Sequence, residues 1–203
     1  MIRIAMRALV ASAILGLAGC ASAPLHYYTL VAPADAPMQA SQLQGLPFEL
    51  LPVSVPAQVD QPQLLVRQGG QGVVLLGSER WIAPLGDEVR SALSSDLVGA
   101  LNSQDVSGLP GNNKPRLRIK LDLRRFDSEP GSYALIDAVW SVRVLGGAAS
   151  VPLACSSHLR ETVGPGYAAL VQGHQRAIGQ LAAQIATVAR SLGAGQPASC
   201  PAG

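Results

Sequence analysis

The feature that most constrains the fold is a strict alternation of apolar and polar residues in two neighbouring segments. In the first, the odd positions of 117–123 hold leucine or isoleucine and the even positions hold charged residues. In the second, beyond a turn at Pro130-Gly131, the even positions of 136–144 are apolar. Side chains of a β-strand point alternately to opposite faces, so this period predicts strands with one buried and one wet face. The two segments therefore predict an antiparallel pair.

Further strand and helix patterns surround this pair. Residues 64–76 contain two apolar stretches around a glycine-rich turn, which predicts a β-hairpin. Leucine or valine recurs every four residues from Leu85 to Leu101, which predicts a helix with one apolar stripe. A second stripe runs through 167–192 and stops at Gly193, as expected of a long closing helix.

Short strands are predicted at 27–30 and 48–55, and residues 151–162, beyond a turn at Gly146-Gly147, are predicted to add a third strand to the antiparallel pair as a meander. The resulting order, ββ(β)αβββα, predicts one layered α/β domain. Its sheet is expected to be mixed but mostly antiparallel, with about six strands, and two main helices accompany it.

The first 19 residues have the composition of an export signal. Arg3 and Arg7 give them a basic start, and the uncharged run 8–19 is too short to cross a bilayer as a helix. The run ends in Leu17-Ala18-Gly19-Cys20, which resembles the lipobox of bacterial lipoproteins, in which the cysteine is acylated and becomes the mature N-terminus. The alternative is an ordinary signal peptide cleaved near Ala21 or Ala23.

On this interpretation the chain has three parts. Residues 1–19 are a lipoprotein signal peptide, residues 20–46 are a lipidated N-terminus with a tether and a short first strand, and residues 47–203 are the domain. The residue after Cys20 is alanine and not aspartate, which by the usual sorting rule indicates the outer membrane. The acyl chains on Cys20, which include palmitate, are then the expected membrane anchor.

Charge and cysteine content narrow the class of protein. Without Arg3 and Arg7, the chain balances 13 basic against 13 acidic residues, and a nucleic-acid-binding protein would show a basic excess. Apart from Cys20, only Cys155 and Cys200 remain, and an exported chain carries them into an oxidising compartment. We expect them to form a disulfide, with two free thiols as the alternative.

Catalytic residues are hard to identify in this sequence. His26, His158 and His174 have no metal-type spacing, and each is expected at a surface or an interface. Asp87 and Glu88 suit the positive end of a helix better than an acid–base pair. The sequence therefore predicts a protein that is not an enzyme and has no metal or cofactor.

Two features each allow either a binding role or a structural one. The first is a group of five basic residues in 116–125. They form either a strip that docks an acidic partner or the anionic headgroups of a membrane, or simply the solvated face of a strand, and we favour the solvated face. Trp81, just before the first helix, either anchors a partner or caps the core.

Four short stretches occur in an order that resembles one known family. They are Tyr27-Tyr28-Thr29-Leu30, Val53-Ser54-Val55-Pro56, Val59-Asp60-Gln61-Pro62-Gln63-Leu64 and Trp81-Ile82-Ala83-Pro84-Leu85, with Arg67 between the last two. Preceded by a lipobox, this order is similar to the ABC-type transport auxiliary lipoproteins, the family of paraquat-inducible protein C. The candidate partner-binding residues in these stretches are Asp60, Pro62, Arg67, Trp81, Pro84 and Leu85.

The resemblance implies a part of an envelope lipid-transport system. Such lipoproteins sit on the periplasmic face of the outer membrane, form ring-shaped homo-oligomers, and dock a tunnel protein of the mammalian cell entry (MCE) type and its permease or ABC transporter. One alternative is a carrier that holds an acyl chain in a cavity lined by Leu85, Leu93, Trp140 and Ile185. A second alternative is an envelope hydrolase that uses His174 and Ser157. A third is a structural lipoprotein without a transport role.

Overall fold

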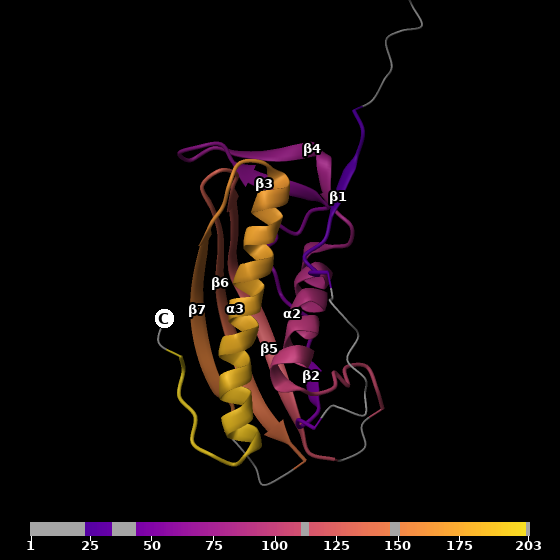
Figure 1. The fold of residues 1–203 in the computed structure, drawn as a ribbon, viewed down its shortest axis with the longest axis vertical. Helices are drawn as coiled ribbons and strands as arrows, with labels where there is room; N and C mark the ends of the chain where they lie inside the picture. Colours follow the sequence, from indigo (N-terminus) through magenta and orange to yellow (C-terminus); the bar gives the residue numbers. More distant parts are fainter. Residues whose placement is uncertain (1–22, 34–43, 111–113, 147–150, 202–203) are drawn as a thin grey trace, which may run out of the picture.

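The computed structural model describes residues 23–33, 44–110, 114–146 and 151–201. The leader and Cys20 lie outside these residues, so the prediction of lipidation is unchanged by the fold. The described residues form seven strands and two helices in the predicted order (Figure 1). In chain order the elements are β1 (His26–Tyr28), β2 (Phe48–Leu50), β3 (Gln63–Arg67), β4 (Val73–Trp81), α2 (Leu85–Leu101), β5 (Arg116–Glu129), β6 (Tyr133–Leu145), β7 (Leu153–Thr162) and α3 (Tyr167–Gly193).

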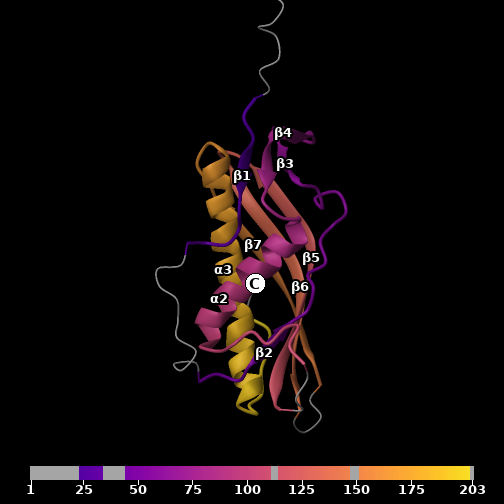
Figure 2. The same ribbon diagram turned by 90° about the vertical axis from the view of Figure 1, so that its right-hand side faces the viewer.

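The larger sheet has the strand order β2-β5-β6-β7. β5, β6 and β7 form the antiparallel meander that the alternating segments predict, and β2 adds to β5 in parallel. Both helices lie on one face of this sheet, where α3 packs on β6 and β7 and α2 packs on α3 (Figures 1 and 2). The predicted α/β fold class, with a mixed and mostly antiparallel sheet, is confirmed.

A second, smaller sheet lies at one end of the molecule, with the order β1-β4-β3 (Figures 1 and 2). The sequence predicts one sheet of about six strands, whereas the structure divides seven strands between two sheets. The reason lies in the β3–β4 hairpin. Val66 of β3 and Leu76 of β4 pack on Ala134, Val163 and Leu170, so the hairpin covers the end of the larger sheet instead of extending its edge.

The alternation in β5 holds only as far as Leu123. The pairing of β5 with β6 shifts register between Leu123 and Arg125, as in a β-bulge, and Arg124 and Arg125 are both exposed. Beyond this shift Phe126, Asp127 and Ser128 are all buried, because β3 bonds Asp127 and α3 contacts Phe126 and Ser128.

Glu88 does more than favour the start of α2. It is 4% exposed, and its Oε2 accepts hydrogen bonds of 2.8 Å from the Thr29 hydroxyl and from the Leu30 backbone N–H. The segment after β1 is thereby fixed to the first turn of α2. Leu30 itself is buried in the main core.

A disulfide joins Cys155 on β7 to Cys200 in the segment that follows α3, as the even cysteine pair predicts.

No helix in the described ranges has the length and apolar character needed to cross a membrane.

Removing this disulfide with Cys155→Ser and Cys200→Ser together is expected to lower the free energy of unfolding by about 2–4 kcal/mol, because the bond closes a loop with a separation of 45 residues. Urea denaturation of the domain measures the change. A midpoint equal to that of the parent protein would contradict the assignment of a stabilising bond.

Candidate functional site

Two of the candidate partner-binding residues are part of the core. The side chain of Trp81 is 5% exposed and meets the Phe126 ring edge-on, with centroids 6.1 Å apart and planes at 79°. Leu85 is 1% exposed. Of the two interpretations open for Trp81, the structure therefore supports the cap on the core, and these side chains support a surface rather than form it.

Three other candidates, Asp60, Pro62 and Pro84, are exposed near the start of α2. The turn before β3 places Asp60, since the backbone N–H groups of Val59 and Asp60 both donate to the carbonyl of Pro56. The Trp81 N–H donates to the Pro62 carbonyl at 2.8 Å, which ties the end of β4 to the start of β3. Two stretches about twenty residues apart in sequence are thus brought together.

Asp60 and Pro84 line one surface hollow of about 430 Å³. Its lining is completed by the extended segment that follows β2 and by the first residues of α2: Pro52, Val53, Ser54, Val55, Gly86 and Asp87. Gly86 permits this close approach, because a Cβ there would lie 3.2 Å from the carbonyl oxygen of Val53. The hollow has a proline- and valine-rich wall and two exposed carboxylates, Asp60 and Asp87, so it suits an apolar segment with a basic residue. We call it the α2 hollow.

Arg67, the sixth candidate, is held in an ion pair. Its Nε donates to both carboxylate oxygens of Asp127, at 2.7 and 2.8 Å, and Arg125 donates to the same carboxylate at 2.7 Å. Burial by itself would raise the pKa of Asp127, but the hydrogen bonds from Arg67 and Arg125 outweigh it and hold that pKa below its usual value. The pair fastens β3 to β5.

The basic residues of 116–125 are also largely paired. Arg116 and Arg118 both approach Glu49 Oε2, at 3.3 and 3.2 Å, and Arg124 lies 3.1 Å from Asp122. These pairs neutralise much of the strip, which agrees with the favoured interpretation of a solvated strand face.

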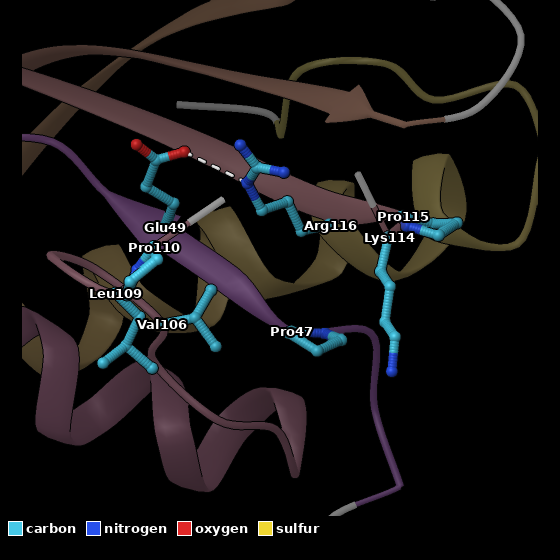
Figure 3. Close-up of a pocket in the computed structure, with 8 residues that line it drawn as sticks. All are labelled: Pro47, Glu49, Val106, Leu109, Pro110, Lys114, Pro115 and Arg116. Carbon is cyan, nitrogen blue, oxygen red and sulfur yellow. Dashed lines mark hydrogen bonds and ion pairs between the residues drawn. The ribbon is translucent and has the colours of Figure 1, made fainter. Parts of the chain in front are cut away.

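A second hollow, of about 450 Å³, lies beside β2 (Figure 3), and β2 is at the end of the molecule opposite the β3–β4 hairpin (Figure 1). Figure 3 shows Arg116 paired with Glu49 across one side of it. Three prolines and two apolar side chains supply most of the remaining lining: Pro47, Val106, Leu109, Pro110 and Pro115, with Lys114 at the edge. Apart from Arg116, none of the sequence-predicted functional residues lines it.

His174 does not lie at a surface, contrary to the expectation from sequence. It is 1% exposed, its ring stacks on Phe126 with centroids 3.9 Å apart, and its Nε2 is 2.8 Å from the Ser128 hydroxyl. Ser157 is engaged elsewhere, between the Trp140 indole N–H and Gln184. The pairing of Ser157 with His174 that a hydrolase would need is therefore not formed. His26 and His158 are the exposed histidines, each paired with a carboxylate.

His174 predicts a pH dependence of stability. Burial lowers its pKa to about 3, against a smaller raising effect of Asp127. Between about 6.5 and 3 the unfolded chain binds a proton that the folded chain does not, so stability falls as the pH falls through this window. From pH 7.5 to pH 5 the free energy of unfolding is expected to fall by about 2 kcal/mol through this residue.

Urea denaturation at several pH values measures this component. His174→Gln is expected to lose it, while the control His158→Gln keeps it. An equal slope in all three proteins would show that His174 does not carry the effect.

In the residues that the structure describes, no three or more histidine, cysteine or carboxylate side chains are grouped as a metal ion would need. The stretches 53–56, 59–64 and 81–85 indicate the α2 hollow in the sequence, whereas Gly86 carries no signal that reasoning from sequence could use.

Comparisons with known proteins agree with this description. A crystal structure of an uncharacterised protein has a TM-score of 0.64 at 18% identity and covers 81% of this chain and 98% of its own. A protein from Xanthomonas campestris has a TM-score of 0.59 at 14% identity, covering 85% of this chain and 98% of its own. At these identities the likeness establishes the fold alone. No match is found among curated proteins.

The family comparison is more specific. A family model described as the ABC-type transport auxiliary lipoprotein component matches residues 28–186, which is more than three-quarters of the chain. The match begins within the first of the four stretches on which the sequence resemblance was based and covers the other three, and the resemblance is confirmed. The chain belongs to the family of ABC-type transport auxiliary lipoprotein components.

Proposed function

We propose that this protein is the outer-membrane-anchored, non-enzymatic component of an MCE-type lipid-transport system, and that it docks the tunnel protein at the periplasmic face of that membrane. The observation that carries the proposal is the α2 hollow. Two stretches that carry the family resemblance, 59–64 and 81–85, converge there and leave Asp60, Pro62 and Pro84 exposed. The family's association with ABC transport supports a role beside a transporter.

The arrangement favours contact over chemistry. The apolar wall of the α2 hollow offers burial to a partner segment, and Asp60 and Asp87 offer charge to a basic residue on that segment. Since Trp81 and Leu85 lie beneath this surface, the hollow is held in place by the core before any partner binds. We propose that the MCE protein supplies the segment, and that several copies of the chain form a ring around the tunnel.

Site-specific photo-crosslinking in the lipidated chain tests this function. A crosslinking residue at Asp60 is expected to recover an MCE-domain protein. The matched control is Leu109, which is also exposed but belongs to the hollow of Figure 3. Recovery from Leu109 and not from Asp60 would move the docking site to that hollow, and recovery from neither would overturn the proposal.

Charge reversal gives a quantitative prediction. Asp60→Arg is expected to weaken association with the MCE protein about tenfold, because the substitution turns an attraction into a repulsion at the edge of the contact. Co-purification from membranes or a binding titration measures the change, and native mass spectrometry of the same sample reports the ring size. Lys120→Glu, on the open face of the sheet, is the control and is expected to bind normally.

The carrier alternative gains no support from the predicted cavity. Leu85, Leu93, Trp140 and Ile185 are each at most 1% exposed and pack within the main core, and the hollows described above have other linings. Lipid that co-purifies with the Cys20→Ala protein would revive this alternative.

A further inference from the structure

Exposed apolar side chains gather at the end of the molecule where the chain enters the domain. Half of the eight large apolar side chains that are exposed in the described residues lie on two neighbouring segments: Leu25 (48%), Tyr27 (57%), Val73 (52%) and Leu75 (46%). The first two belong to β1 and the residue before it, and the other two to the β3–β4 hairpin. We call these four residues the end patch.

The strand pattern directs the end patch away from the core. On β4, Val73 and Leu75 alternate with Leu76, which packs on the core beneath the hairpin. On β1, His26 and Tyr28 both bond Glu79, so Tyr27 between them points to the other face.

A bulge brings the two pairs to the same face of the sheet. Gln63 of β3 pairs with Arg80 of β4, and Leu65 pairs with Leu75. Between these two pairs β3 advances by two residues, whereas β4 advances by five. The bulge in β4 therefore contains three extra residues. Because three is an odd number, the odd-numbered side chains of β4 point to the outer face before the bulge and the even-numbered ones do so after it. After it, Arg80 lies on the outer face beside its neighbour Tyr27.

The position of the end patch indicates what covers it. In both views the small sheet and the start of β1 occupy the same end of the molecule (Figures 1 and 2). Leu25 is five residues after Cys20, and a chain of that length reaches at most about 18 Å. A lipid on Cys20 therefore holds this end within reach of the bilayer.

Charge supports a lipid surface over a protein partner. The hairpin has no charged residue from Gln68 to Ser78, and the chain has none of Asp, Glu, Lys or Arg from Ala21 to Ala34. Neither segment brings a carboxylate that would have to leave water on contact with lipid. Tyr27 beside Arg80 adds the aromatic and basic pair that suits the headgroup region.

We infer that the end patch rests in the headgroup region of the bilayer that holds the lipid anchor, so that the β3–β4 hairpin fixes the orientation of the domain on the membrane. The inference rests on the proposed lipid anchor, but it adds a second contact that the anchor does not supply. A lipid on a tether alone leaves the domain free to tilt.

Fluorescence quenching by spin-labelled lipids tests the contact. The lipidated chain carries a bimane label on either Leu75→Cys or the control Leu109→Cys, with the disulfide intact. Each protein is reconstituted into phosphatidylethanolamine–phosphatidylglycerol vesicles that contain nitroxide lipids, and circular dichroism checks the fold. Quenching at position 75 is expected to exceed that at position 109 at least threefold.

Flotation of the same vesicles separates the two possible failures. If the proteins float but both labels are quenched equally weakly, the anchor is sound and the inference about the end patch is overturned. A blue-shifted label at position 75 without vesicles would overturn it in favour of contact between copies of the chain. If neither protein floats, the lipid anchor itself fails, and with it the proposed function.

Discussion

Replacing Cys20 by alanine is expected to release the protein from the membrane and to abolish its contribution to the envelope. The thiol of Cys20 is the group that the lipobox interpretation assigns to acylation, and the domain has no membrane-spanning helix in its described residues to replace it. An acyl chain contributes about 0.8 kcal/mol for each buried methylene. Summed over all of its methylenes, this is far more than a small apolar patch can supply. The membrane-bound fraction is expected to fall from nearly all of the protein to less than about one-tenth.

Fractionation of cells that express the variant at the normal level measures this release, and sensitivity to detergent or other membrane stress reports function. Ser22→Ala is the matched control, because it changes a neighbouring residue and leaves the lipobox intact. Ala21→Asp is a second control for sorting, and it is expected to remain lipidated but to leave the outer membrane. A Cys20→Ala protein that still supports the envelope would show that acylation is not part of the mechanism.

Replacing Trp81 by alanine is expected to lower the free energy of unfolding by about 3–5 kcal/mol. The indole is buried at the junction of β4, β5 and α2 and packs edge-on against Phe126, so its removal leaves a cavity where the small sheet meets the main core. Trp81→Phe keeps an aromatic ring in the same place and is expected to cost far less.

Urea denaturation measures the loss, with Asp60→Ala as an exposed control that is expected to change stability by less than about 0.5 kcal/mol. The experiment also decides between the two interpretations of Trp81. If Trp81→Ala folded with parental stability but no longer bound the MCE protein, Trp81 would be a partner anchor. Its packing in the core would then contribute little to stability.

The sequence predicts local periodicity well, because one face of each element is buried. In α2, Leu85, Val89 and Leu93 follow the four-residue spacing and are buried as expected. Likewise, the glycine-rich turn between β3 and β4 forms the predicted hairpin, with positive φ angles at Gly69 and Gly70 that favour glycine. Such features depend on residues close together in sequence.

Pairings between distant segments could not be predicted in this way. β2 lies parallel to β5, with Phe48 opposite Leu117, and nothing in either stretch indicates that partner. His174 shows the same limit, since its position on the closing helix suggests an interface, while Phe126 and Ser128 enclose it from β5. For the same reason, the sequence predicts the candidate site only in part. Its stretches are visible in the sequence, but the burial of Trp81 depends on its packing against Phe126 of β5, which is distant in sequence.

The way in which β1 is held determines how the domain responds to a pull on its N-terminus. β1 runs parallel to β4, so tension applied through the preceding chain acts along the strand and shears its hydrogen bonds together, instead of opening them one at a time. Behind β1, the bonds from Thr29 and Leu30 to Glu88 carry the load into α2 and the core. The domain is thus mechanically coupled to the chain that precedes β1, and a force applied to that chain passes through folded structure.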